Sequence, residues 1–201
     1  NDVIERPLDG LLDLSGWDLR KALRLLHKSN PPLLEWLNSP ILYMEKNSVG
    51  DRLRGLLPEY YSPTACLYHY LHMARGNHKE YLRGETVWMK KYFYVLRPLL
   101  AIRWIEEGRG VVPMEFETLL ADVAGEQDFK LAVSGLLERK IKGEELDKGP
   151  RIPEISDFID REMGRLDEKR FERRAPKPPM DGLNEIFRLC IHEAYRAGQS
   201  I

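Results

Sequence analysis

The longest apolar run in the chain has helical periodicity, so the fold must be built around a buried helix. This run spans residues 85–107. Its regularly spaced apolar members are expected in the core: Trp88, Tyr92, Val95, Leu99 and Ile102. Pro98 lies inside the run and should kink the helix or mark a boundary, because a proline removes a backbone hydrogen bond. No apolar run in the chain approaches the length of a membrane span.

Most of the remaining chain also predicts helices, separated by turns that contain proline or glycine. The expected helices span residues 15–28, 32–38, 49–57, 63–75, 112–122, 126–141, 154–173 and 181–197. Strand-like sequence is confined to residues 2–14, on either side of a turn at Pro7–Gly10. We expect residues 143–153 to form a polar loop and Gly76-Asn77 to end the fourth helix. The sequence therefore predicts a mainly α fold with a β fragment at its front.

The overall charge excludes one class of protein. Lys and Arg number 31 and Asp and Glu number 32, so the net charge is −1 and not the basic excess of a nucleic-acid coat protein. Any anion-binding surface must therefore be local. Cys66 and Cys190 are too few for a disulfide framework and lie in apolar helical sequence, so we expect both to be reduced and buried in a cytoplasmic protein.

Asp13 is the first candidate for a functional carboxylate. It lies on a short apolar strand just before Ser15, and Ser15-x-x-Asp18 has the pattern of a helix N-cap. One interpretation is a metal ligand or a base in phosphoryl transfer, since acids hold Mg²⁺ against a triphosphate. The other is an exposed acid in a turn, and the pattern alone favours this second interpretation.

Two groups of basic residues are candidates for binding an anion. The first helix carries cations at spacings that share a face, among them Lys21 and Arg24. They predict either a contact with phosphate or an ordinary solvated face. In the apolar run, Lys90, Tyr94 and Arg97 are spaced to share one face. They could line a cleft that binds a nucleotide, or snorkel along the edge of the core.

A possible zinc site does not withstand the spacing argument. Cys66, His69 and His72 lie at positions i, i+3 and i+6, which diverge around a helix, and no fourth ligand is evident nearby. We interpret them as ordinary residues of the core and its boundary.

Two dense motifs resemble a known family. The first is Asp13-Leu-Ser-Gly-Trp-Asp-Leu-Arg-Lys-Ala-Leu, followed by Lys28-Ser-Asn-Pro, Leu34-Glu-Trp-Leu and Ser39-Pro40. The second is Lys90-Lys-Tyr-Phe-Tyr-Val-Leu-Arg-Pro-Leu-Leu-Ala-Ile-Arg-Trp104. Together they resemble the YcgL/RlaP-type predicted nucleotidyltransferases, which belong to the DNA-polymerase-β-like superfamily and include members associated with RNA repair. The resemblance extends over about residues 2–120.

The resemblance implies a metal-dependent transfer of a nucleoside monophosphate from a nucleoside triphosphate to a hydroxyl acceptor. In that superfamily three carboxylates hold two Mg²⁺ ions. By position Asp13 resembles the third carboxylate, with Glu5 as the fallback. Lys90, Tyr94 and Arg97, and more weakly Lys21 and Arg24, would then meet the triphosphate or its base. RNA is one of the partners that the resemblance implies.

One departure from the family qualifies this expectation. The chain has no Gly-Ser turn followed by an Asp-x-Asp strand, and the family layout would place that element before Asn1. We therefore expect residues 1–48 to be the C-terminal part, or remnant, of an α/β nucleotidyltransferase palm, and residues 49–201 to be a helical domain. The alternative is a non-catalytic helical module that binds RNA or a protein.

Overall fold

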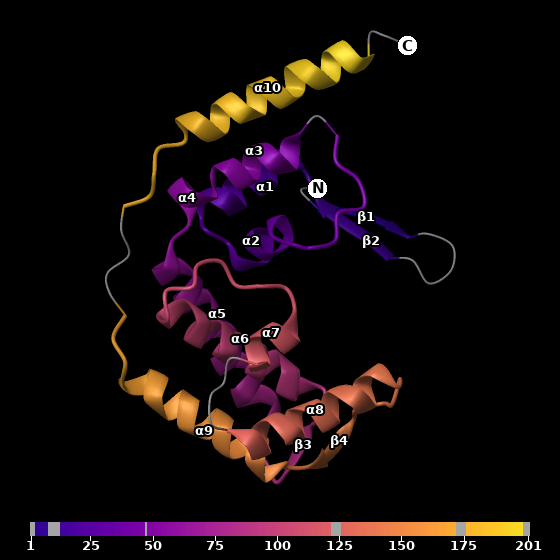
Figure 1. The fold of residues 1–201 in the computed structure, drawn as a ribbon, viewed down its shortest axis with the longest axis vertical. Helices are drawn as coiled ribbons and strands as arrows, with labels where there is room; N and C mark the ends of the chain where they lie inside the picture. The colour runs from indigo at the N-terminus through magenta and orange to yellow at the C-terminus, as the bar shows by residue number, and fades with distance from the viewer. Residues whose placement is uncertain (1–2, 8–12, 47, 122–125, 172–175, 199–201) are drawn as a thin grey trace. The chain divides into compact units, whose positions relative to one another are not determined.

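The chain folds into helices and short strands grouped in two compact units. The computed structural model describes residues 3–7, 13–46, 48–121, 126–171 and 176–198 (Figure 1). The first unit comprises residues 1–62 and 175–201, and the second comprises residues 63–174. The prediction of a mainly α fold is confirmed. The predicted palm boundary after residue 48 stays a prediction, since it concerns the family's architecture and not these contact units.

The first unit contains two strands and five helices in its described residues. They are β1 (Val3–Pro7), β2 (Asp13–Trp17), α1 (Leu19–His27), α2 (Pro31–Leu37), α3 (Val49–Gly55), α4 (Leu57–Tyr60) and α10 (Asp181–Gly198). β1 and β2 pair antiparallel, from Val3 opposite Trp17 to Pro7 opposite Asp13. The helix predicted at 49–57 is divided into α3 and α4, with Leu56 between them.

The start of α1 differs from the prediction. Asp18, not Ser15, is the N-cap, and its carboxylate accepts a hydrogen bond from the Lys21 backbone N–H at 2.7 Å. Ser15 instead continues β2 opposite Glu5. The physical reason is that the cap residue needs extended backbone next to the helix, and Asp18 has it (φ −65°, ψ 160°).

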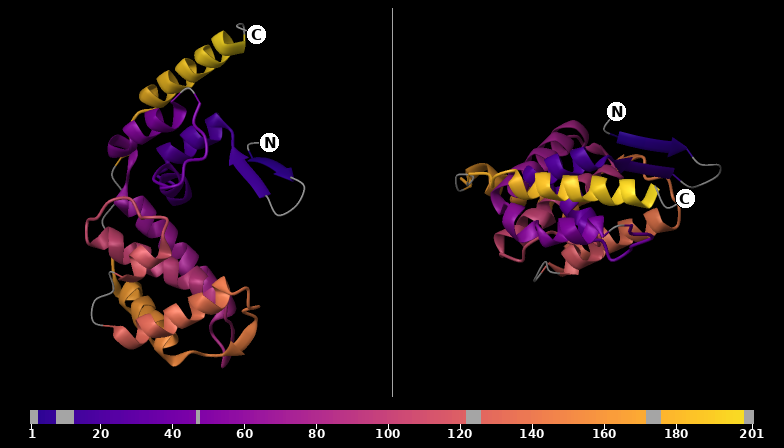
Figure 2. Two further views of the ribbon diagram at one scale, coloured as in Figure 1. Left: turned by 45° about the vertical axis from the view of Figure 1, so that its right-hand side comes forward. Right: turned by 90° about the horizontal axis from the view of Figure 1, so that it is seen from above.

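The C-terminal helix α10 (yellow in Figure 2) packs against α1 in the first unit. Leu183 and Cys190 are buried, and burial raises the pKa of the Cys190 thiol. Just before the helix, Tyr60 Oη donates to the Pro179 carbonyl at 2.7 Å, and His27 Nε2 donates to the Pro178 carbonyl at 3.0 Å. The proline-rich segment that precedes α10 is therefore held by two side chains from earlier in the chain.

The second unit is built on the pair α5–α6. Its described elements are α5 (Pro63–Tyr81), β3 (Thr86–Trp88), α6 (Lys91–Glu106), α7 (Phe116–Ala121), α8 (Gln127–Ile141), β4 (Lys148–Pro150) and α9 (Pro153–Glu168). The four predicted core residues of α6 are buried: Tyr92, Val95, Leu99 and Ile102. Pro98 is also buried, and α6 continues through it. Cys66 on α5 is buried, as expected.

The predicted start of the α6 helix was wrong, because residues 86–88 form a strand. β3 pairs antiparallel with β4, which lies in the segment expected to be a loop. Backbone bonds extend the pairing: the N–H groups of Met89 and Lys90 donate to the carbonyls of Asp147 and Leu146 at 2.9 and 3.1 Å. Trp88, expected in the core, is only half-buried on this strand. The strand that pairs with β3 lies about 60 residues later in the chain, so no local sequence pattern around residues 86–88 predicts the pairing.

The predicted end of α5 was also wrong. The helix continues through Gly76 and Asn77 to Tyr81. A glycine inside a helix costs only about 1 kcal/mol relative to alanine. Burial of Leu71, Ala74 and Leu82 beside this segment outweighs that cost. α7 and α9 are shorter than predicted, since α7 begins at Phe116 and α9 ends at Glu168.

A buried carboxylate connects α9 to α6. Glu162 is 2% exposed and accepts hydrogen bonds from Arg103 at 2.6 Å and from Arg165 at 3.0 Å. Arg165 and Lys169 each lie 2.9 Å from the carboxylate of Glu106 on α6. Burial by itself would raise the pKa of Glu162, but the hydrogen bonds and charges of Arg103 and Arg165 outweigh it and hold that pKa below its usual range.

Four further contacts support the same packing. The Arg103 guanidinium lies 4.9 Å over the Phe158 ring, which stacks on Phe129 of α8 at 4.0 Å. The buried Tyr92 hydroxyl is 2.8 Å from Ser156 Oγ and accepts from the Ile152 N–H at 3.0 Å.

Among the described residues, no helix has both the length and the apolar character needed to cross a membrane.

We predict that Glu162→Gln destabilises the protein by about 2 kcal/mol, because it removes the buried negative charge that the half-buried guanidinium groups of Arg103 and Arg165 share. Asp157→Asn, at an exposed position on the same helix, should change the free energy of unfolding by less than about 0.5 kcal/mol. Chemical denaturation of both variants measures the difference. Equal stabilities of the two variants would contradict the assigned role of Glu162.

The same carboxylate should make stability depend on pH. Its native pKa lies below the value of about 4.3 of an unfolded glutamate, so its contribution is complete above that pH and disappears as the pH falls through the native pKa. The stability difference between the wild type and Glu162→Gln should therefore be constant from pH 7 to about 5 and narrow on further acidification. Denaturation series at several pH values test this, and a difference that stays constant to pH 3 would contradict it.

Candidate functional site

Asp13 is the first residue of β2, opposite Pro7 of β1. The side chain of Asp13 lies outside the described part of the structure, so its role as a metal ligand or base stays a prediction. Glu5, the fallback acid, pairs with Ser15 in the strand register, and its side chain is exposed. The short sheet thus places both candidate acids on neighbouring strands.

The α1 candidates lie next to a pair of stacked tryptophans. The Lys21 ammonium is 5.8 Å from the centroid of the Trp17 ring. That ring stacks on Trp36 of α2, with centroids 4.2 Å apart and planes inclined by 16°. Arg24 is three residues beyond Lys21 and is exposed. Sequence reasoning did not find the tryptophan pair, because the turn between α1 and α2 brings the two rings together.

Lysines and aromatic rings alternate where β3 leads into α6. The ammonium groups of Lys90 and Lys148 lie 5.3 and 5.1 Å from the centroid of Trp88. Lys91 lies between two rings, 4.2 Å from Tyr81 and 4.5 Å from Tyr94. We call this set the lysine–aromatic surface: Tyr81, Trp88, Lys90, Lys91, Tyr94 and Lys148. It contains two of the predicted site residues, Lys90 and Tyr94.

Arg97 serves a different structural purpose from Lys90 and Tyr94. Its two terminal nitrogens donate to the carbonyls of Pro113 and Met114, each at 3.0 Å. The guanidinium therefore fixes the segment that leads into α7. A role for Arg97 in binding phosphate stays a prediction.

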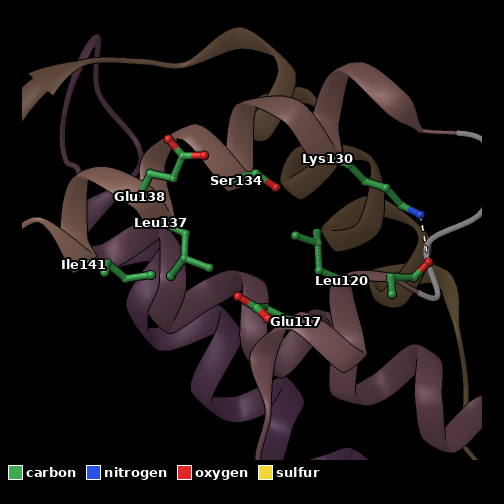
Figure 3. Close-up of a pocket in the computed structure, with 8 residues that line it drawn as sticks. Glu117, Leu120, Lys130, Ser134, Leu137, Glu138 and Ile141 are labelled. Carbon is green, nitrogen blue, oxygen red and sulfur yellow. Dashed lines mark hydrogen bonds between the residues drawn. The ribbon is translucent and has the colours of Figure 1, made fainter.

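Two of the pockets in the described part of the structure lie in the second unit. One, of about 410 Å³, lies between α7 and α8. Figure 3 shows Lys130, Ser134 and Leu137 of α8 facing Leu120 and Glu117 across it. None of the predicted site residues lines this pocket. The other, of about 420 Å³, lies beside β4 and is lined in part by Met89, Leu146 and Lys148.

The described residues do not assemble a metal site. No three His, Cys, Asp or Glu side chains among them lie close enough to hold an ion. The carboxylate of Asp13 falls outside that set.

Comparison with known proteins identifies the family. The chain matches the RlaP family, the RNA repair pathway DNA polymerase beta family, over residues 1–189. The chain belongs to this family. The chain is 48% identical over 200 residues to the uncharacterized protein YcgL of Bacillus subtilis (strain 168). The aligned region covers 99% of this chain and 77% of YcgL. No solved structure matches the chain.

Membership of the RlaP family confirms the resemblance to the YcgL/RlaP-type proteins. It places the chain among the DNA-polymerase-β-like proteins. The relative is itself uncharacterized, so its name assigns no substrate.

We predict that Arg97→Gln loosens the 112–116 segment of this RlaP protein, because the guanidinium makes two hydrogen bonds to its carbonyls. Bonds from a charged donor are worth about 2 kcal/mol, which corresponds to roughly 30-fold faster amide exchange in that segment. Hydrogen–deuterium exchange measures the effect. Arg83→Gln, at an exposed position in the same unit, is the control, and equal exchange in the two variants would contradict the role of Arg97.

Proposed function

We propose that the protein transfers a nucleoside monophosphate from a nucleoside triphosphate to a hydroxyl acceptor. The observation that carries this proposal is the match to a DNA polymerase beta family over residues 1–189. Nucleotidyl transfer is the reaction that such a family name describes. The lysine–aromatic surface supports the proposal, since ammonium groups and rings are the groups that meet phosphates and bases.

Within this proposal Lys90 and Tyr94 contact the triphosphate or its base. Lys21 and Arg24 are the weaker candidates for binding phosphate. Arg97 positions the segment that precedes α7 and adds a phosphate contact from the same helix.

Mg²⁺ and its ligand Asp13 belong to the proposal as well. The described residues do not by themselves fit a metal centre, so we derive no metal-dependent step from them. The substitution of Asp13 is therefore the most direct test.

We predict that Asp13→Asn lowers nucleotidyl transfer by about 100-fold or more, because stabilising the charge at a reacting phosphate through a metal is worth several kcal/mol. The assay uses full-length protein, each of the four labelled nucleoside triphosphates and oligonucleotides with free hydroxyl ends. Glu5→Gln is the matched variant on the neighbouring strand, and thermal unfolding checks that both variants fold.

Each outcome has a defined meaning. Full transfer by Asp13→Asn removes Asp13 from the mechanism, and a loss confined to Glu5→Gln assigns the role to Glu5. A wild type that transfers no label but binds nucleic acid contradicts the enzyme proposal and favours the non-catalytic binding module.

A further inference from the structure

The lysines where β3 meets α6 contact rings and not carboxylates. Lys90, Lys91 and Lys148 each lie within 5.3 Å of a ring centroid, and none of the three forms an ion pair with another described residue. Lys140 nearby lies in the same way, 5.0 Å over Phe93. Neighbouring arginines behave differently, since Arg139 pairs with Glu144 and Arg151 with Asp160. The positive charge of the lysines therefore stays available to a partner.

This excess of positive charge is local. The surface residues lie within two stretches, residues 79–94 and 139–151. Together these stretches contain nine Lys and Arg but only five Asp and Glu, whereas the whole chain has 31 Lys and Arg and 32 Asp and Glu. The β3–β4 pairing joins the two stretches. A basic patch on a protein without net positive charge is the electrostatic footprint of an anionic partner.

The aromatic rings of the lysine–aromatic surface indicate which kind of anionic partner it binds. Tyr94 is 52% exposed, and Trp88 and Tyr81 are partly buried. Exposed rings can stack on bases that are unpaired, whereas the bases of a duplex stack on each other. Ammonium groups held about 4–5 Å from the rings lie where the phosphates beside a stacked base would be. Neither a simple phosphate nor a lipid headgroup offers a flat ring that would stack on the exposed ring of Tyr94.

We propose that the lysine–aromatic surface binds a single-stranded nucleic acid, and that this strand is the hydroxyl acceptor of the reaction, so that Lys90 and Tyr94 contact the acceptor strand in place of the triphosphate. The second half of this statement rests on the proposed function, and the first half does not. The pocket beside β4 shares Lys148 with the surface, so the strand passes its rim.

The test is binding of a fluorescent single-stranded oligonucleotide to the full-length protein, followed by anisotropy at several salt concentrations. The first variant is Lys90→Gln/Lys148→Gln, at two exposed positions. We expect about 20-fold weaker binding at 0.1 M salt, and a slope of log K against log salt that is shallower by about 1.4, since each phosphate contact on a single strand contributes about 0.7. Lys46→Gln/Lys177→Gln is the control, with the same change of charge at exposed positions in the first unit.

The second variant tests stacking separately from charge. Tyr94→Ala should weaken binding by about 5- to 100-fold without changing the salt slope. Tyr43→Ala, at a tyrosine that is 95% exposed in the first unit, should leave binding unchanged. A duplex of the same sequence should bind more weakly than the single strand. Strands of RNA and of DNA are both measured: either one supports the proposal, and the ratio of their affinities identifies the sugar.

Three results of the binding experiments would overturn the inference. These are equal weakening by the two lysine pairs, a duplex that binds as tightly as the single strand, and no binding of any nucleic acid, which would leave an acidic protein as the partner. Transfer to a strand without binding at this surface would refute this inference alone. Binding without transfer would leave the binding surface standing and count against the proposed function.

Discussion

The buried carboxylate of Glu162 is the interaction on which the second unit depends. Moving a carboxylate out of water costs several kcal/mol unless charged donors compensate for it. Here the donors come from α6 through Arg103 and from α9 itself through Arg165. The compensation requires one register of α9 against α6, since a shift by one residue would turn the carboxylate away from Arg103. A hydrophobic contact would tolerate such a shift more readily, so the charge selects the arrangement as well as stabilising it.

This arrangement also determines what the surface at the start of α6 presents. α9 begins directly after β4, and the Tyr92 hydroxyl accepts from the N–H of Ile152 at that junction. β4 is thereby held where it can pair with β3, and Gly149 passes so close to Met89 that a Cβ there would lie 3.3 Å from its side chain. Lys148 consequently reaches the ring of Trp88. The buried hydrogen bond of Tyr92 and the position of Lys148 at the surface are thus connected through the three residues of β4.

Sequence reasoning succeeded where the signal was local and periodic. The spacing of Tyr92, Val95, Leu99 and Ile102 predicted the buried face of α6, and the motif around Asp13 predicted the family. It failed where the cause was distant. The strand at Thr86–Trp88 exists because residues 148–150 pair with it, and the stacked pair Trp17–Trp36 forms across a turn.

The candidate site shows the same division. The spacing of Lys90 and Tyr94 predicted that they lie close together at the start of α6, whereas their role in binding stays a prediction. Trp88 was assigned to the core, and Lys148 was not considered, since nothing in the local sequence reveals that a lysine 60 residues later lies at the same ring. The spacing of Arg97 places it on the same face of α6, but two of its N–H groups donate to the backbone carbonyls of Pro113 and Met114. Spacing identifies which residues share a face, and only the tertiary contacts show what each one does there.

The hydrogen bonds from His27 and Tyr60 to the Pro178 and Pro179 carbonyls have a consequence for the order of folding during synthesis. α10 belongs to the first unit, although the entire second unit is translated between Ser62 and its start. The apolar side of α1 therefore emerges from the ribosome long before the helix that packs on it. The second unit, continuous in sequence, can complete its core first, and the first unit closes last when His27 and Tyr60 capture the returning chain. Of the two units, the first is thus the one that finishes folding last, because it needs α10, which is made after the whole second unit.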